Sequence, residues 1–153
     1  MKVVSTLLVA AAVSGALLSC SKKDDAAPSK TSLLTSNTWK LTAVTVSPGI
    51  PQGGTTITDY YAQLPACQKD NIYRYATPNV YTDDEGPSKC NSTDPQTNTG
   101  TWVFNTDQTV LTISEGGTTQ SVNLTALDAN MMVQSFGTTL NNVTYTFTAT
   151  YKH

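Results

Sequence analysis

Few residues of this sequence belong to the types that usually perform catalysis or bind metal ions. The 153-residue chain has one histidine, His153 at its last position, so general acid–base chemistry and most metal sites lack their commonest group. It contains no Gly-x-Ser-x-Gly nucleophile motif and no glycine-rich phosphate loop. Asp59, Asp70, Asp94 and Asp107 fall in expected turns and loops, where acids are common anyway. We therefore expect no enzymatic activity, no catalytic residue, no metal and no cofactor.

The first of the three cysteines lies in a context that predicts lipid attachment. Lys2 precedes an apolar stretch over residues 3–16, which is too short to span a bilayer comfortably. The stretch ends in Leu17-Leu18-Ser19-Cys20, which resembles the bacterial lipobox, where the cysteine sulfur is diacylated and becomes the new N-terminus. We expect residues 1–19 to be a lipoprotein signal peptide and Cys20 to be lipidated. The alternative is an ordinary signal peptide.

Residues 20–32 are expected to form the lipidated cysteine and a flexible tether, because they are small, polar and interrupted by Pro28. Lys23-Asp24-Asp25 resembles the short Lys/acidic tag of surface-exported lipoproteins of the Bacteroidetes group. A solubilising linker is the alternative. These features predict a lipid-anchored protein of the cell outer membrane, and they leave its exposure on the cell surface open.

Cys67 and Cys90 are the two thiols that remain. Two cysteines in an exported chain most simply form one disulfide. A redox or metal role would need closer spacing or a nearby histidine, and the sequence offers neither. We predict a structural disulfide that ties residue 67 to the long polar loop over residues 83–98.

Composition favours β-structure and disfavours nucleic acid as a partner. The chain has 27 threonines, and only 13 % of its residues are charged. Its net charge of −2 offers no basic surplus for a phosphate backbone.

Hydrophobic alternation predicts an all-β domain over residues 33–153, with turns between short strands. Residues 48–54 are predicted to be a loop by composition, and residues 59–70 to hold a single helical turn that ends before Pro65. In the first strand the apolar residues change face after Ala43, which suggests a bulge or burial on both sides. The eight predicted strands cover residues 38–46, 72–76, 80–82, 99–104, 110–114, 122–126, 131–136 and 143–151. Their spacing favours an antiparallel meander, closed as a barrel or packed as a sandwich.

The domain resembles the lipocalin-like domains of Bacteroidetes lipoproteins over about residues 32–152. The resemblance rests on the lipobox and tether, followed by Leu33-Leu34, Trp39-Lys40-Leu41, Cys67-Gln68-Lys69-Asp70-Asn71, Cys90 and Gly100-Thr101-Trp102. Asn37 stands where the first strand of lipocalins usually carries glycine. The resemblance implies an eight-stranded up-and-down barrel with an apolar cup.

Aromatic and methionine side chains are the candidates for lining that cup, and the alternative is that they fill a solid core. The candidates are Trp39, Trp102, Phe104, Met131, Phe136, Tyr145 and Phe147, with Tyr151 on the same face of the last strand. Asp83-Asp84-Glu85 could offer oxygen ligands to Ca²⁺, but it lacks the alternating spacing of a calcium loop and is expected to be a solvated acidic turn. Tyr60, Tyr61, Tyr73, Tyr75 and Tyr81 form a tyrosine-rich region that either packs or contacts a partner.

Two functions remain open. The first is a monomeric, membrane-anchored barrel that binds a small apolar or amphipathic molecule. The second is a ligand-free interaction or inhibitor module, which would contact an envelope protein or glycan through residues 48–54 and 83–98. An internal cavity of about 300 Å³ or more would favour the first function.

Overall fold

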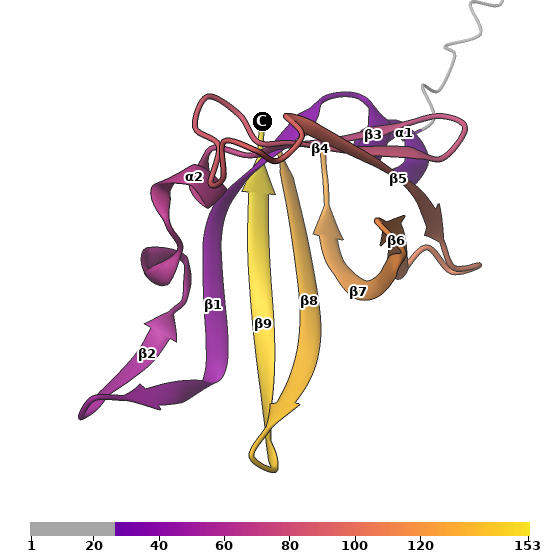
Figure 1. Cartoon of the computed structure of the whole chain (residues 1–153). Coiled ribbons are helices and arrows are strands. Elements are labelled where there is room, and N and C mark those ends of the chain that lie inside the picture. Colours follow the sequence, from indigo (N-terminus) through magenta and orange to yellow (C-terminus); the bar gives the residue numbers. More distant parts are fainter. Residues whose placement is uncertain (1–26) are drawn as a thin grey trace, which may run out of the picture.

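Strand β1 pairs with β9, and this pairing closes an antiparallel up-and-down sheet into a barrel (Figure 1). The computed structural model describes residues 27–153. Its strands are β1 (Thr38–Gln52), β2 (Thr55–Asp59), β3 (Ile72–Ala76), β4 (Val80–Asp84), β5 (Thr97–Phe104), β6 (Val110–Glu115), β7 (Thr118–Leu127), β8 (Met131–Leu140) and β9 (Val143–Lys152). Its helices are α1 (Lys30–Thr35), the 3₁₀ helix η1 (Tyr61–Gln63) and α2 (Ala66–Lys69). The predicted eight-stranded barrel is confirmed, with β2 as an extra strand that pairs only with β1.

The predicted signal peptide (residues 1–19) and the predicted lipid site Cys20 lie outside the described residues. The predicted tether over residues 20–32 extends too far, because α1 already begins at Lys30. The Ser29 hydroxyl accepts a 3.1 Å hydrogen bond from the Ser32 amide and caps this helix. The helix belongs to the barrel because Leu34 is completely buried.

A bulge in β1 explains why its apolar residues change face along the sequence. The pairing of β1 with β9 shifts register between Leu41 and Ala43. Beyond this shift Val44 and Val46 are buried, as Leu41 is before it. The bulge that the sequence suggested is therefore confirmed.

The segment 48–54 is not a loop, which corrects the composition-based prediction. Strand β1 continues to Gln52 and pairs with β2, with Ile50 opposite Ile57. Only Gly53 and Gly54 turn the chain, both at positive φ, as a two-residue hairpin turn requires. The loop expected over residues 83–98 is also shorter, because β4 extends to Asp84 and β5 begins at Thr97.

Helix α1 covers one end of the barrel. The Trp39 indole Nε1 donates a 2.9 Å hydrogen bond to the Leu34 carbonyl, and the Lys30 ammonium donates one of 2.7 Å to the Gln108 carbonyl in the β5–β6 turn. Leu111 and Met132 pack at the same end with no exposed surface. This end is therefore closed and filled.

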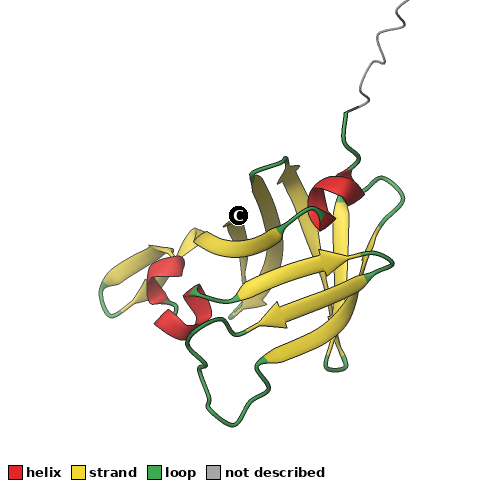
Figure 2. Cartoon of the chain, turned by 90° about the horizontal axis from the view of Figure 1, so that it is seen from above, coloured by secondary structure: helices red, strands yellow, loops and turns green. Residues whose placement is uncertain are grey.

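The opposite end carries the β4–β5 loop (residues 85–96), the β6–β7 and β8–β9 turns, η1 and α2, because turns alternate ends in an up-and-down barrel. Figures 1 and 2 show α1 and α2 on opposite sides of the barrel. Over residues 27–153 we find no helix with the length and apolar character needed to cross a bilayer.

Candidate functional site

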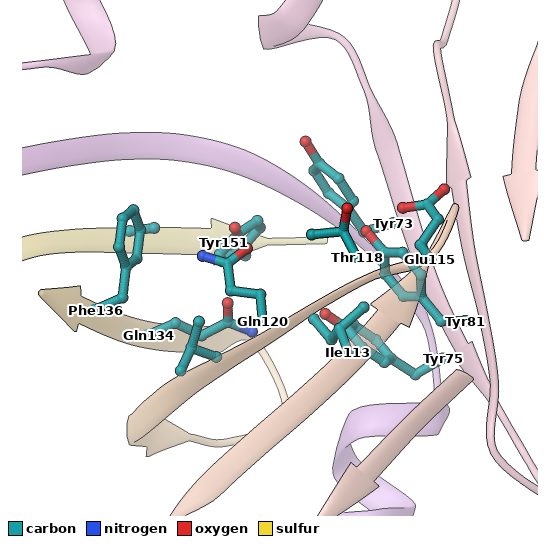
Figure 3. A pocket seen from close by; sticks show the side chains of 12 residues that line it. Tyr73, Tyr75, Tyr81, Ile113, Glu115, Thr118, Gln120, Gln134, Phe136 and Tyr151 are labelled. Atoms are coloured by element: carbon teal, nitrogen blue, oxygen red, sulfur yellow. The ribbon is translucent and has the colours of Figure 1, made fainter. Parts of the chain in front are cut away.

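A cavity of about 320 Å³ lies inside the barrel, above the layer of side chains that fills the closed end. Figure 3 shows its labelled side chains surrounding a common space. The cavity wall comes from alternate, inward-facing positions of β3, β4, β6, β7, β8 and β9. The lining residues are Tyr73, Tyr75, Tyr81, Ile113, Glu115, Thr118, Gln120, Val122, Gln134, Phe136, Ala149 and Tyr151.

Four tyrosines dominate this wall. Tyr75 and Tyr81 are directly opposite each other on β3 and β4, with ring centroids 5.3 Å apart. Tyr73 meets Tyr151 edge to face at 5.6 Å. Burial raises the pKa of all four hydroxyls, that of Tyr151 to about 12. At neutral pH all four therefore remain protonated and can both donate and accept hydrogen bonds.

Two carboxyl groups lie at the opening: Glu115 lines the cavity itself, and Asp83 lines the two adjoining hollows. Asp83 on β4 lies opposite Tyr73, and Glu115 on β6 lies opposite Thr118. Burial raises the pKa of Asp83 to about 6, and the nearby charges of Glu115 and Glu85 add to the effect. Burial also raises the pKa of Glu115.

A larger hollow of about 750 Å³ adjoins the cavity and shares Tyr73, Phe136, Ala149 and Tyr151 with it. It lies where β1 leaves β3, since these strands pair only over Thr38–Lys40. The segment with η1 and α2 covers this gap, and the Tyr60 amide donates a 2.8 Å hydrogen bond to the Val44 carbonyl. A third hollow of about 510 Å³ is bordered by both Asp83 and Glu115. The two acids thus border one continuous opening.

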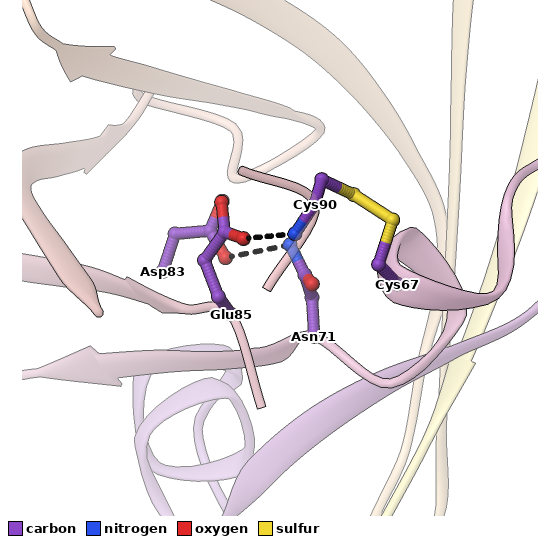
Figure 4. The surroundings of a disulfide bond; sticks show 5 residues. All are labelled: Cys67, Asn71, Asp83, Glu85 and Cys90. Carbon is purple, nitrogen blue, oxygen red and sulfur yellow. Dashed lines mark hydrogen bonds between the residues drawn. A yellow bond between two sulfur atoms is a disulfide. The ribbon is translucent and has the colours of Figure 1, made fainter. Parts of the chain in front are cut away.

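The disulfide between Cys67 and Cys90 is confirmed, with Cα atoms 5.1 Å apart. It joins α2 to the β4–β5 loop at the rim of the larger hollow (Figure 4). The Glu85 carboxylate accepts a 3.0 Å hydrogen bond from the Cys90 amide. Cys90 is therefore fixed through both its side chain and its backbone amide.

The acidic turn 83–85 is only partly solvated, which corrects the expectation from sequence. Asp84 is half-buried, and its carboxylate accepts hydrogen bonds from Gly86, Gln96 and Thr97 that lower its pKa. Asp83, the preceding residue, points the opposite way into the barrel because neighbouring strand positions alternate in face. Among residues 27–153, no group of three or more His, Cys, Asp and Glu side chains could hold a metal ion.

The structure brings only two of the seven candidate cup residues to these spaces. Phe136 lines both the cavity and the larger hollow, and Phe147 lines the hollow, with the two rings stacked at 5.3 Å. The other five line none of the three spaces: Trp39, Trp102, Phe104, Met131 and Tyr145.

Each of these five has a clear structural place. Trp39 and Trp102 are buried at the closed end, where the Trp102 indole donates a 3.0 Å hydrogen bond to the Ala76 carbonyl. Phe104 packs against the same cluster, and Tyr145 is buried beside β1. Met131 lies on the face opposite to Met132, which is the inward-facing methionine.

The sequence reasoning overlooked Glu115 and Gln134 as lining residues. Glu115 continues the alternation of Leu111 and Ile113 by one step, so extending that pattern would have placed it inside. Gln134 lies between two inward-facing positions, Met132 and Phe136, and the same argument applies.

The sequence matches no protein-family model, and no curated protein shows significant similarity to it. The fold and its cavity nevertheless define a class. This chain is a small, closed, eight-stranded antiparallel barrel whose interior is compatible with holding one small ligand.

Proposed function

We propose that this chain is a lipid-anchored lipoprotein with a lipocalin-like barrel of the Bacteroidetes type, which holds a small amphipathic molecule at the outer membrane. The observation that carries the ligand-binding part is the interior cavity of about 320 Å³, which falls in the range of small-molecule sites. A solid barrel would have favoured the alternative of a ligand-free interaction module.

The lining supports an amphipathic rather than a purely apolar ligand. Phe136, Ile113 and the tyrosine rings offer apolar contact, while Gln120, Gln134 and Glu115 offer polar contact. Asp83 adds a second carboxyl group in the hollow that it shares with Glu115. Burial of apolar surface would supply affinity, and the few polar groups would orient the molecule.

Lipid anchoring at Cys20 fits the position of the described chain. The described residues begin at Ala27, next to α1, which covers the closed end. A tether that leaves from the closed end would keep the cavity opening on the far side, away from the membrane surface.

Native mass spectrometry tests the binding function on the full chain carrying Cys20→Ala, which replaces the proposed lipid site and avoids detergent. We expect a discrete added mass on the folded protein. Ala149→Phe is the matched variant, because Ala149 is buried and lines both the cavity and the hollow, so a larger side chain fills the shared space. The added mass should disappear in that variant. If Cys20→Ala, expressed in the native host, shows only the mass of the protein without a bound ligand, the interaction module is favoured.

Membrane fractionation tests the anchor separately. The unaltered chain should sediment with membranes and Cys20→Ala should be released as a folded domain. If Cys20→Ala stays membrane-bound, the lipoprotein proposal is wrong, whatever the mass spectra show.

A further inference from the structure

The charged groups that line the cavity and the two hollows all have the same sign. Glu115 lines the cavity and shares the third hollow with Asp83, and Asp83, Glu85 and Asp94 border the larger hollow. No lysine, arginine or histidine among residues 27–153 lines any of the three spaces. A buried carboxylate without a counter-charge is unfavourable, so the site is suited to a cation.

The lysines of the surrounding segments are engaged elsewhere. The Lys69 ammonium on α2 lies over the Tyr61 ring, 5.0 Å from its centroid. Lys89 in the β4–β5 loop donates hydrogen bonds to the backbone carbonyls of Ser92 and Asp94. Neither ammonium makes a salt bridge with Asp83 or Glu115 in the described part of the chain.

Buried acceptor atoms at the opening lack donors. Over residues 27–153, three buried side-chain oxygens have no hydrogen-bond partner: Oδ1 of Asp70, Oδ1 of Asn71 and Oε1 of Glu115. Asn71 lines the larger hollow and Glu115 lines the cavity. Because a buried unpaired acceptor costs free energy, these oxygens indicate a ligand that donates hydrogen bonds.

Tyr81 adds an independent observation. Its side chain is only 6 % exposed and lines the cavity, and within the described residues its hydroxyl makes no hydrogen bond. Because this oxygen is not among the fully buried atoms without a partner, it is open to the cavity, where a polar group of the ligand can bond it. The neighbouring rings of Tyr73 and Tyr75 offer faces on which a cation is stabilised.

We propose that the ligand of this cavity is a protonated organic amine with an aromatic or apolar body, whose N–H groups are bound by Asp83 and Glu115. The tyrosine hydroxyls and rings surround the ammonium group, and the body of the molecule packs toward Phe136. This inference rests on the proposed binding function and adds the charge and donor character of the ligand.

Three probes with the same ring test the inference: phenethylammonium, 2-phenylethanol and phenylacetate. Each is titrated into isotopically labelled Cys20→Ala chain at up to millimolar concentration, and amide chemical shifts report affinity and location. We expect phenethylammonium to bind most tightly and to shift the amides around Asp83 and Glu115. Asp83→Asn and Glu115→Gln should each lower the affinity for phenethylammonium about ten- to a hundredfold. The affinity for 2-phenylethanol should stay unchanged. Asp107→Asn, an exposed acid in the turn at the closed end, should change nothing.

The outcomes separate this inference from the function on which it rests. If the alcohol or the carboxylate binds in the cavity as tightly as the amine, the barrel binds ligands but the charge assignment is wrong. The same holds if the double variant of Asp83 and Glu115 retains the affinity for the amine. If none of the three probes shifts a cavity amide, both proposals fail. Because the comparison among probes uses unaltered acids, it remains decisive even if a variant does not fold.

Discussion

The Asn71 side-chain amide donates a 3.3 Å hydrogen bond to the Asp83 carboxylate and so joins the segment after α2 to the inner face of β4 (Figure 4). This hydrogen bond favours the ionised form of Asp83, yet burial and the negative charges of Glu115, Glu85 and Asp84 outweigh it. Tyr73, Tyr75, Tyr81 and Tyr151 are the other titratable groups beside it, and they are neutral at neutral pH. Asp83 is therefore a carboxyl whose ionisation opposes folding.

The pH dependence of stability follows from this shift. In the folded state the pKa of Asp83 is raised from 3.8 to about 6, so the folded protein binds the proton more tightly than the unfolded chain does. The cost of burying the charge is complete above about pH 6 and disappears below about pH 4. Since Asp83 is partly solvated, we expect its ionised carboxylate to lower the free energy of unfolding by about 1–2 kcal/mol at neutral pH.

Denaturant unfolding of the unaltered chain and Asp83→Asn measures this cost. Asparagine keeps the oxygen that accepts from Asn71, so the variant should be more stable at neutral pH and lose this advantage near pH 4. The difference between the two proteins cancels the titration of other acids. A variant that is less stable at neutral pH would contradict the assignment of Asp83 as an unfavourable buried charge.

The disulfide between Cys67 and Cys90 should stabilise the fold by about 3 kcal/mol, because it closes a loop across a separation of 23 residues in the unfolded chain. The paired variant Cys67→Ser and Cys90→Ser should therefore unfold at lower denaturant concentration. Adding a reductant should lower the stability of the unaltered domain to that of the variant and leave the variant itself unchanged. Equal stability of the oxidised domain and the variant would show that the bridge adds nothing to folding.

Alternation along the chain predicts most of this fold, because a barrel strand with one buried face has a period of two. The last strand shows this directly, since Tyr145, Phe147 and Ala149 are buried while their threonine neighbours face outward or are less buried. Gly116-Gly117 was also a reliable turn signal, and both residues adopt positive φ.

The errors arise where the local pattern does not determine the face or the pairing. Met131 and Met132 are adjacent and equally apolar, so the sequence does not say which faces inward; the register with β9 decides in favour of Met132. The prolines and glycines of residues 48–54 indicate a loop, but an outlying hairpin tolerates Pro51 because β2 pairs only with β1.

The acidic side of the cavity was the hardest feature to predict. Asp83 and Glu115 are 32 positions apart in the sequence and meet only because β4, β5 and β6 are consecutive in the barrel. A single strand pattern gives the inward direction of each side chain, but the closed sheet is needed to bring both to the same opening.

Gly100 should be intolerant of any side chain. It faces Tyr81 on β4 and Glu115 on β6, and an added Cβ would collide with the Ser114 carbonyl oxygen, which belongs to the backbone and cannot move away independently. We expect Gly100→Ala to cost about 1–3 kcal/mol. Gly137→Ala in β8 is the matched control, because its nearest contact would be the Tyr145 carbonyl oxygen at 3.9 Å. Thermal unfolding should separate the two variants, and similar losses for both would rule out the close approach of β5 and β6.

Helix α1 should contribute to stability as part of the core, although it precedes the first strand. Leu34 is completely buried against the closed-end cluster, and its carbonyl accepts the hydrogen bond from Trp39. Leu34→Ala should cost about 2–5 kcal/mol, because it removes a buried side chain and leaves a cavity. Leu33→Ala, one position earlier and only half-buried, should cost about 1 kcal/mol or less. Denaturant unfolding followed by tryptophan fluorescence measures both, since Trp39 reports directly on this end. If the two variants lose the same small amount, α1 is not part of the barrel core, and the closed end is held by Trp39, Leu111 and Met132 without it.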